Sequence, residues 1–278
     1  MLDSPAPTPT RAEAGLRRAD EGPVALLTLD RPQARNALSE SLIAALAAEL
    51  DAIAADAGTK VVIIRAEGPV FSAGHDLREL TAHRAAGDRG RVAFDRVLRS
   101  CAAMMQRIVR LPQPVIAVVE GTATAAGCQL VASCDLAVAG EAARFCTPGV
   151  HIGLFCSTPM VALSRNVSRK HAMEMLLLGE LVPAAEAWRM GLVNRVTPPG
   201  GALDEAMAMA RTIAQKSGPV LAIGKRAFTD QLEMPLTQAY EHAAAVMVEN
   251  MLARDAQEGI EAFLEKRAPV WEEPAHEP

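Results

Sequence analysis

The stretch Val115-Ile-Ala-Val-Val-Glu-Gly-Thr-Ala-Thr-Ala-Ala-Gly127 joins an apolar run to a loop of small residues. A continuous apolar run such as 115–119 is typical of a strand buried in a parallel sheet that helices cover. The small residues of 121–127 lead into a helix-like segment that contains Leu130 and Ala132. The stretch therefore predicts a strand, a tight loop and a helix in succession, which is the repeating unit of an α/β fold.

The same pattern extends to both sides of this stretch. Apolar runs predict further strands at 24–30, 60–66 and 136–139, with a strand fragment at 192–196. Periodic apolar residues predict helices at 40–56, 91–111, 160–178, 184–190, 203–217 and around 225–265. Alternation of strands and helices favours parallel pairing with right-handed crossovers. We expect a mobile arm at 1–21, an α/β core at 22–200 and a helical C-terminal subdomain at 201–278.

Composition narrows the class of ligand. The 278-residue chain is 50% hydrophobic and 22% charged, which is typical of a globular protein with a substantial core. Its 28 basic and 33 acidic residues give a net charge of −5, and aromatic residues make up only 3%. This balance argues against nucleic-acid binding, and no apolar run approaches the ~20 residues of a membrane-spanning helix. We therefore expect a small-molecule ligand.

Cysteine usage and the N-terminus predict the compartment. The five cysteines form no Cys-x-x-Cys pair and no zinc-like spacing, so reduced core thiols are the preferred interpretation. Residues 1–20 lack a hydrophobic segment, and their three acidic residues argue against a transit peptide. A cytoplasmic location is predicted. The six histidines form no spaced ligand set, so no metal is expected.

Two loops of small residues follow predicted strands, at 71–76 and at 124–129. Small residues let backbone N–H groups approach a ligand closely, and the second loop enters a helix N-terminus, which favours negative charge. Together the loops can aim two amides at one developing oxyanion. Neither loop has the spacing of a nucleotide phosphate cradle. Packing or turn formation is the alternative interpretation of both loops.

Several motifs, in order and in spacing, resemble the enoyl-CoA hydratase/isomerase (crotonase) superfamily over residues 22–272. The motifs are Arg31-Pro-Gln-Ala-Arg-Asn-Ala-Leu38, Gly68-Pro-Val-Phe-Ser-Ala-Gly-His-Asp-Leu77, Pro114–Gly121, Ala126-Gly-Cys-Gln-Leu130, Cys134-Asp135 and Gly259–Arg267. The stretch Phe145–Pro159 more narrowly resembles the enoyl-CoA hydratase domain-containing protein 3 group. The resemblance implies a ββα-spiral core with a helical C-terminal trimerisation subdomain, assembly as a homotrimer or a dimer of trimers, and acyl-CoA thioester ligands, with coenzyme A entering only as part of the substrate.

The resemblance also implies roles for particular residues. The family holds the thioester carbonyl with two backbone amides, which fall here at His75 and Ala126. Its two catalytic glutamates fall at Gln129 and Gly149. An amide cannot take up a proton at neutral pH and glycine has no side chain, so hydration by the family mechanism is doubtful. Further positions match or neighbour the family's substrate contacts: Arg35, Ala37, Leu38, Ala73, Asp76, Leu77, Arg78, Lys225 and Lys266. An ordinary solvated charge is the alternative for each basic residue, and loop scaffolding is the alternative for Asp76.

Three residues are candidate substitutes for the missing acid–base groups. The imidazole of His75 suits proton transfer, although its backbone amide alone can be what matters. Glu120 ends an apolar run and is either a base with a raised pKa or a capping acid. His151 is more simply structural. Two hypotheses follow: an acyl-CoA enzyme that stabilises an enolate-like oxyanion, and a catalytically silent acyl-CoA-binding or regulatory protein.

Overall fold

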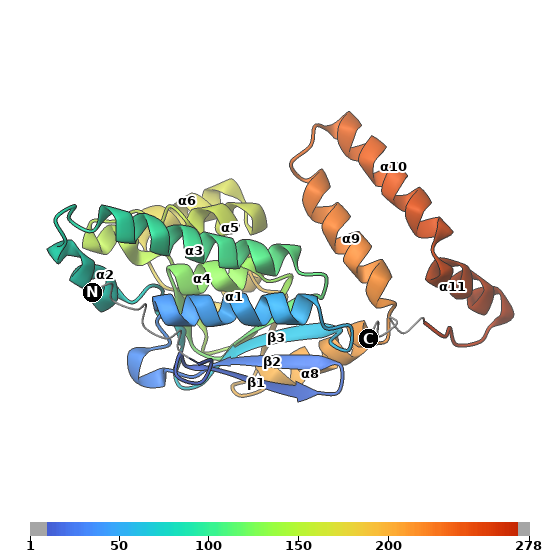
Figure 1. Ribbon diagram of the computed structural model, residues 1–278, viewed down its shortest axis with the longest axis horizontal. Coiled ribbons are helices and arrows are strands. Elements are labelled where there is room, and N and C mark those ends of the chain that lie inside the picture. The colour runs from blue at the N-terminus through green and yellow to red at the C-terminus, as the bar shows by residue number, and fades with distance from the viewer. Residues whose placement is uncertain (1–9, 272–278) are drawn as a thin grey trace, which may run out of the picture.

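A computed structural model describes residues 10–271 of the chain, which fold around two β-sheets (Figure 1). The larger sheet has the strand order β1-β2-β3-β5-β7-β10 and the smaller sheet the order β4-β6-β8-β9. The strands of the larger sheet are β1 Leu16–Glu21, β2 Val24–Leu29, β3 Val61–Ala66, β5 Val115–Val119, β7 Leu136–Gly140 and β10 Arg195–Thr197. Those of the smaller sheet are β4 Val70–Ser72, β6 Thr122–Thr124, β8 Arg144–Cys146 and β9 Val182–Pro183.

The helices lie on both faces of the larger sheet and in an arm at one end (Figure 1). They are α1 Glu40–Ala54, α2 Leu77–Ala82, α3 Arg91–Arg110, α4 Ala126–Ser133, α5 Pro159–Asn166, α6 Arg169–Leu178, α7 Ala184–Met190, α8 Ala202–Ala214, α9 Gly218–Gln231, α10 Leu236–Leu252 and α11 Arg254–Glu265. Short 3-10 turns are η1 Pro32–Ala34, η2 His83–Ala85 and η3 Pro148–Ile152. None of the helices within 10–271 is long and apolar enough to cross a membrane.

Strands of the two sheets alternate along the chain. β3 is followed by β4, β5 by β6 and β7 by β8, so the chain steps three times from the larger sheet to the smaller one. β2, β3, β5, β7 and β10 pair in parallel, and β4, β6 and β8 also pair in parallel. The fold is the expected mixed α/β crotonase-like ββα spiral. Strands of three residues in the smaller sheet are too short to show periodicity, so the sequence did not predict them.

Successive side chains along a strand of the larger sheet pack into two different hydrophobic clusters, one on each face of the sheet. Ala25, Leu27 and Leu29 of β2 pack with α1 and α3, whereas Val24 and Leu26 pack with α8. This period of two follows from the alternation of side chains along a strand. Because α8 covers the second face of the sheet, it belongs to the core. The domain boundary predicted at residue 200 is therefore wrong, and the helical subdomain begins at α9.

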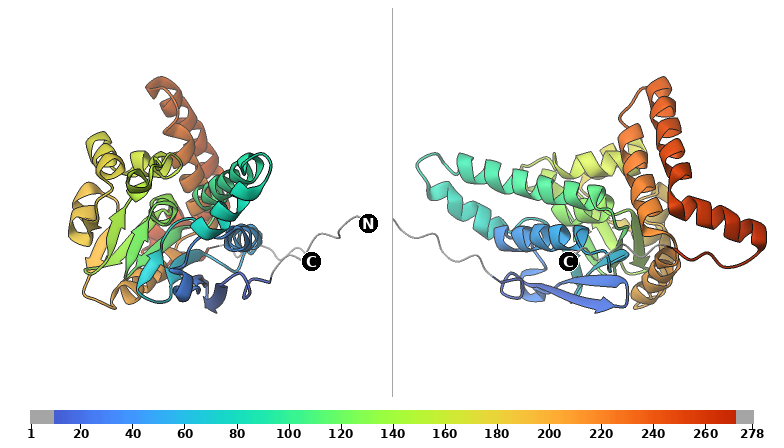
Figure 2. Two further views of the ribbon diagram at one scale, coloured as in Figure 1. Left: turned by 90° about the vertical axis from the view of Figure 1, so that its left-hand side faces the viewer. Right: turned by 45° about the vertical axis from the view of Figure 1, so that its right-hand side comes forward.

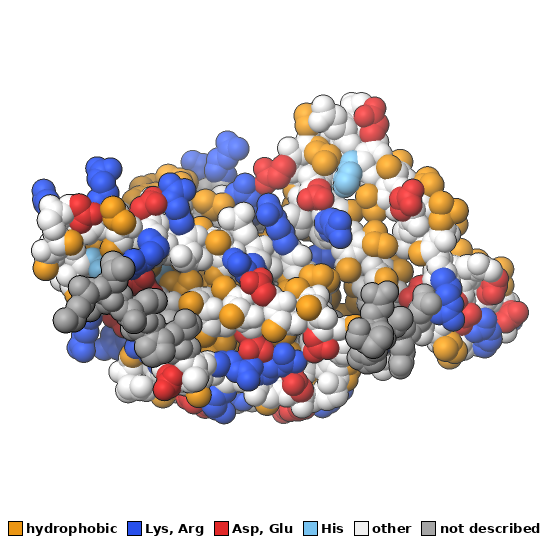
Figure 3. All heavy atoms as spheres, in the orientation of Figure 1, with side chains coloured by type: hydrophobic (Ala, Val, Ile, Leu, Met, Phe, Trp, Pro, Cys, Tyr) orange, Lys and Arg blue, Asp and Glu red, His pale blue; other side chains and the backbone are white. Residues whose placement is uncertain are grey.

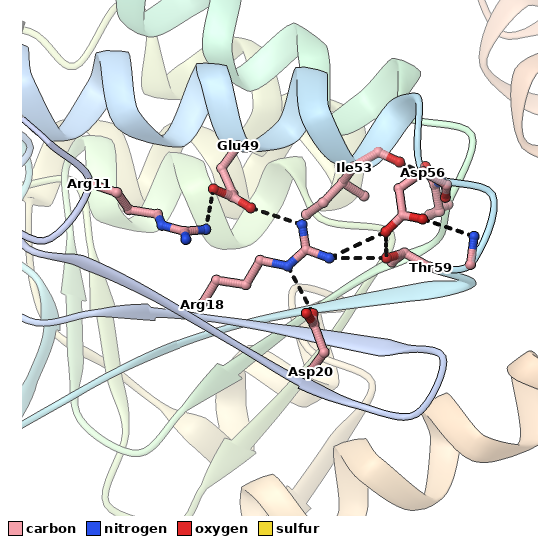
Figure 4. A network of polar contacts seen from close by, with 9 residues as sticks. Arg11, Arg18, Asp20, Glu49, Ile53, Asp56 and Thr59 are labelled. Carbon is pink, nitrogen blue, oxygen red and sulfur yellow. Dashed lines mark hydrogen bonds and ion pairs between the residues drawn. The ribbon is translucent and has the colours of Figure 1, made fainter. Parts of the chain in front are cut away.

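The prediction of a mobile N-terminal arm over 1–21 is wrong for residues 16–21. Residues 16–21 form β1, which pairs antiparallel with β2; residues 1–9 lie outside the described part. Figure 4 shows the ion pairs that connect this N-terminal segment to α1. Glu49 accepts hydrogen bonds from Arg11 and Arg18, and Arg18 also donates a hydrogen bond to Asp56. Because Glu49 is buried, this ion cluster is a fixed part of the fold rather than a solvated surface pair.

Helices α9 and α10 form an arm that projects from the body, and α11 extends outward from the end of α10 that is opposite to the turn between α9 and α10 (Figure 2). Neither α9 nor α10 contributes a buried residue to the described chain. Orange hydrophobic side chains cover much of this arm in Figure 3. The chain returns from α11 to the body, where Trp271 Nε1 donates a hydrogen bond of 2.7 Å to the Gln215 carbonyl. The Trp271 ring passes Gly259, where a Cβ would lie 3.2 Å from the ring.

Candidate active site

The two loops of small residues meet at the end of the smaller sheet. A Cβ at Gly74 would lie 3.2 Å from the Ala126 nitrogen, and a Cβ at Gly127 would lie 2.3 Å from the Ser72 carbonyl oxygen. Side chains at these positions would therefore separate the loops, and glycine permits the contact. The structure thus brings His75, which follows Gly74, beside Ala126, the first residue of α4.

Both of the amides predicted for the site are free of partners within residues 10–271. Leu38 N donates to the Gly74 carbonyl at 2.8 Å and Asp76 N donates to the Leu38 carbonyl at 3.3 Å. In this parallel bridge the intervening His75 amide points away from Leu38. The Ala126 amide lies in the first turn of α4, where N–H groups have no intrahelical acceptor. Two unused donors therefore lie side by side at the positive end of a helix.

Backbone strain marks the same point. Ala125 has φ 49° and ψ −118°, a conformation that residues with a Cβ rarely adopt. Its N–H donates a hydrogen bond of 2.9 Å to the Cys146 carbonyl of β8, and its carbonyl accepts a hydrogen bond of 3.0 Å from Gln129 N. These two hydrogen bonds hold Ala125 in its strained conformation directly before the Ala126 amide.

A third loop, 35–38, is attached to the site. Ala73 N donates to the Arg35 carbonyl at 3.0 Å, and the side chain of Asn36 donates to the carbonyls of Glu67 and Val70. Arg35 is exposed, as are Leu77 and Arg78 at the start of α2, whereas Ala37 and Leu38 are buried. Neither guanidinium forms an ion pair with another residue of the described chain. Arg35 and Arg78 are therefore free cations at the rim of the amide pair.

The structure places neutral groups where the family has glutamates. Gln129 lies in the first turn of α4 with its side chain buried. Gly149 lies in η3 rather than in the expected strand, and a Cβ there would lie 2.9 Å from both the Cys156 Sγ and the Leu154 carbonyl oxygen. The Cys156 thiol thus fills the space beside residue 149. A glutamate at 149 needs the segment 154–156 to move.

The loop 71–76, helix α4 and the N-cap of η3 each carry a buried polar group without a partner in the described chain. Both ring nitrogens of His75, Gln129 Oε1 and Thr147 Oγ1 are buried and have no hydrogen-bond partner within residues 10–271. Each such group costs about 1–3 kcal/mol. Burial lowers the pKa of His75, and the nearby Leu38 carbonyl opposes this shift, so the ring is neutral. Thr147 was missed by the sequence analysis because a lone threonine carries no motif.

Three thiols lie on α4, at the end of β8 and after η3. Cys128, Cys146 and Cys156 are buried and free. Burial raises the pKa of all three thiols. Such thiols are protonated at neutral pH and unreactive as nucleophiles.

Glu120, one of the sequence candidates, is structural. Its carboxylate accepts hydrogen bonds from Gly200 N at 3.0 Å and Ala202 N at 2.9 Å, where it caps α8. Of its two interpretations, the structure therefore favours the capping acid. Glu120 also lines a cavity of about 250 Å³ with Arg65, Phe71 and Gly121. This cavity lies where β4 and β6 begin, at the opposite end of these strands from the amide pair.

Lys225 and Asp76 are also part of the scaffold. Lys225 Nζ is bound to the carbonyls of Ile108 and Gln113 at 3.0 Å and to Asp135 at 2.6 Å, which leaves no donor for a phosphate. Asp76 accepts from the amides of Arg78 and Glu79 as the N-cap of α2. The prediction that these two side chains contact substrate is corrected accordingly.

Lys266 and His151 lie away from the amide pair. Lys266 ends α11, which lies at the opposite end of the molecule from α2 in Figure 1, so it does not reach the site of its own chain. His151 lies in η3, where its Nε2 is 2.8 Å from the Leu178 carbonyl oxygen. Its expected structural role agrees with this contact.

Comparison with known proteins identifies the class that this fold and site define. The enoyl-CoA hydratase/isomerase family model matches residues 19–274. The chain belongs to this family, whose members bind acyl-CoA thioesters.

Among particular proteins, the chain is 48% identical over 264 residues to the enoyl-CoA hydratase domain-containing protein 3, mitochondrial, of Rattus norvegicus, covering 95% of this chain and 84% of that protein. It is 47% identical over 274 residues to the Homo sapiens protein of the same name, covering 99% and 85%. The crystal structure of the human protein matches with a TM-score of 0.87 and 46% identity, over 92% of this chain and 100% of that chain. An enoyl-CoA hydratase structure from Mycobacterium smegmatis matches with a TM-score of 0.87 and 48% identity, over 92% and 98%.

These relatives correct one prediction. The rat and human proteins are named mitochondrial, which contradicts the predicted cytoplasmic location. That prediction depended on free thiols and on the composition of residues 1–20. Free thiols indicate only a reducing environment and do not tell one reducing compartment from another.

Proposed function

We propose that the protein binds an acyl-CoA thioester and holds its carbonyl oxygen between the backbone amides of His75 and Ala126. The observation that carries the proposal is the pair of free amides, set side by side by Gly74 and Gly127 in a chain of this family. Both donors belong to the backbone, so they survive the side-chain changes around them. No cofactor is needed besides the coenzyme A that the substrate carries.

The amide pair stabilises negative charge on the thioester oxygen. Two N–H donors and the N-terminus of α4 favour an enolate-like oxyanion over the neutral carbonyl. Each such donor is worth ~10²–10³ in rate where the chemistry forms an oxyanion. Arg35 and Arg78 at the rim are suited to the phosphates of coenzyme A, because a guanidinium matches phosphate geometry.

A silent acyl-CoA-binding protein is the second candidate, and the lost carboxylates favour it. Water addition to a 2-enoyl thioester needs a group that takes and returns a proton. Gln129 and Gly149 supply none, Glu120 is bound to α8, and the three thiols are protonated. The imidazole of His75 is the remaining neutral base at the site.

Turnover and binding measured together separate the two candidates. Loss of the crotonyl-CoA enoyl absorbance reports hydration, and calorimetry with butyryl-CoA reports binding. If the parent turns over and His75→Ala, which keeps the amide, is inert with an unchanged melting curve, the imidazole is the base. Binding without turnover supports either the silent protein or another reaction on an acyl-CoA. Absence of butyryl-CoA binding contradicts the proposal itself.

A variant that restores a glutamate at position 149 must also make room for it beside the Cys156 thiol. Gly149→Glu alone places its side chain against the Cys156 thiol, so the informative variant is Gln129→Glu/Gly149→Glu/Cys156→Ala. Hydratase activity in this variant, from an inert parent, supports the silent-binder interpretation. Gln129→Glu alone serves as the control with one carboxylate.

We further propose that the arm of α9–α11 packs against other copies of the chain, as a homotrimer or a dimer of trimers. The arm exposes large apolar side chains that a soluble surface rarely gathers. They are Phe228, Leu232, Leu236, Tyr240, Met247, Val248, Met251, Leu252, Phe263 and Leu264. Sedimentation should give three or six times the 29.4 kDa chain mass, and a stable monomer would contradict this assembly.

A further inference from the structure

Asn36 is a fully buried polar residue whose side-chain oxygen and nitrogen are both hydrogen-bonded. Its Oδ1 accepts from Arg31 N at 2.7 Å, and its Nδ2 donates to the carbonyls of Glu67 at 2.8 Å and Val70 at 2.7 Å. Its backbone has φ 50°, a left-handed conformation that asparagine adopts more readily than most residues with a Cβ. Both the side chain and the backbone at this position therefore favour asparagine.

These three hydrogen bonds attach the loop 35–38 to the point where the chain passes between the two sheets. Glu67 directly follows β3 of the larger sheet, and Val70 begins β4 of the smaller sheet. The chain continues from β4 into Ala73 and Gly74, which precede His75. The side chain of Asn36 therefore fixes the loop 35–38 relative to the start of the segment that carries one of the two free amides.

The end of the loop 35–38 holds the residues on either side of His75. Leu38 N donates to the Gly74 carbonyl at 2.8 Å, and Asp76 N donates to the Leu38 carbonyl at 3.3 Å. The Gly74 carbonyl and the His75 N–H belong to one peptide unit, which is trans. In a planar trans peptide these two groups point in opposite directions. The hydrogen bond from Leu38 N therefore directs the His75 N–H away from the loop 35–38.

We propose that Asn36 positions the His75 amide that binds the thioester oxygen. Its side chain fixes the loop 35–38, and Leu38 at the end of this loop fixes the peptide unit whose N–H faces the ligand. Because Asn36 is fully buried, it acts through Leu38 and is a positioning residue. The inference rests on the proposed function, since it concerns the direction of one of the two amides.

Two substitutions remove the hydrogen bonds of Asn36 in different ways. Asn36→Gly introduces a residue that tolerates φ 50° and removes all three side-chain hydrogen bonds. Asn36→Asp keeps the shape and the acceptor for Arg31 N, and it removes both donated hydrogen bonds because a carboxylate has no N–H.

Gln113→Leu is the matched control. Gln113 is also buried, and its side-chain amide donates to two carbonyls, those of Ile53 at 2.8 Å and Asp56 at 3.3 Å. These carbonyls lie at the C-terminal end of α1 and just beyond it, whereas the loop 35–38 precedes the N-terminal end. The 15 residues of α1 separate the two ends by about 22 Å. The control therefore removes similar hydrogen bonds far from the His75 amide.

Butyryl-CoA bound to the full-length protein reports the direction of the amide. We expect Asn36→Gly and Asn36→Asp to bind about fivefold more weakly than the parent, because a misdirected donor loses most of one hydrogen bond. The infrared stretching band of a ¹³C-labelled thioester carbonyl should also shift less on binding to these variants. Gln113→Leu should lose stability and keep the affinity and band position of the parent.

Hydrogen exchange of the parent protein tests the same connection without a substitution. The Leu38 amide should be protected in the free protein, because it is bonded to the Gly74 carbonyl. The His75 amide should become protected only when butyryl-CoA binds. Fast exchange of the Leu38 amide in the free protein overturns the inference.

The outcomes separate this inference from the proposed function. Parent-like affinity and band position in both Asn36 variants overturn the inference and leave the amide pair standing. Equal losses in Gln113→Leu also overturn it, because they would come from a general loss of stability. If butyryl-CoA does not bind to the parent, or binds without a band shift, the proposed function fails.

Discussion

The substitution Gly127→Ala tests whether the close approach of the two loops creates the site. The new methyl carbon would lie 2.3 Å from the Ser72 carbonyl oxygen, whereas ordinary contact begins at 3.4 Å. The loop and α4 must therefore separate by about 1 Å, and a shift of that size at a reacting group can cost ~10²-fold in rate. Overpacking of this kind also lowers the free energy of unfolding by about 1–3 kcal/mol.

The assay combines chemical denaturation with butyryl-CoA calorimetry. We expect Gly127→Ala to be folded, less stable than the parent by that amount, and at least several-fold weaker in binding, since a displaced amide loses its hydrogen bond to the ligand. Gly87→Ala is the control, because a Cβ at Gly87 meets no atom within 4 Å. Parent-like stability and affinity in Gly127→Ala would refute the reasoning.

Three further predictions concern buried groups. Lys225→Met should lower the free energy of unfolding by about 3 kcal/mol, because it leaves the Asp135 carboxylate without its paired cation. The double variant Lys225→Met/Asp135→Asn should recover part of this loss, and denaturation curves measure both changes. Because the pKa of His75 is lowered in the folded state, the unfolded state binds more protons than the folded state below about pH 6.5. The free energy of unfolding should therefore fall as the pH drops through that range, and it should fall less in His75→Asn. Burial raises the pKa of Cys146 to about 11 and also that of Cys156, so an aromatic disulfide reagent at pH 8 should label these thiols only after denaturation; rapid labelling of native protein would contradict their burial.

Elements with clear boundary residues could be predicted from the sequence, whereas the short strands of the smaller sheet could not. The strand 115–119 and the helix 184–190 match β5 and α7 at both ends, because each is bounded by turn residues. The predicted helix 160–178 is in fact two helices, α5 and α6, and Ser168 caps the second by accepting from His171 N. The strands of the smaller sheet depend on pairing between distant segments, which local periodicity does not record.

The close approach of the two loops could be predicted from the sequence, and the partners of several charged side chains could not. Small residues at 74 and 127 indicate where two loops approach, whereas the choice of the His75 and Ala126 amides came from the resemblance to the family. The partners of a charged side chain depend on tertiary contacts. Lys225 therefore resembled a phosphate ligand in the sequence, whereas the fold binds it to Asp135 and two carbonyls.

The infrared spectrum of a bound thioester tests the amide pair most directly. Butyryl-CoA labelled with ¹³C at the thioester carbonyl gives an isolated stretching band, which moves to lower wavenumber when the oxygen accepts strong hydrogen bonds. Two amides at the N-terminus of α4 predict a clear downward shift on binding to the parent protein, reduced in Gly127→Ala. A band that stays at its position in free butyryl-CoA, with the ligand bound, would contradict the role of His75 and Ala126.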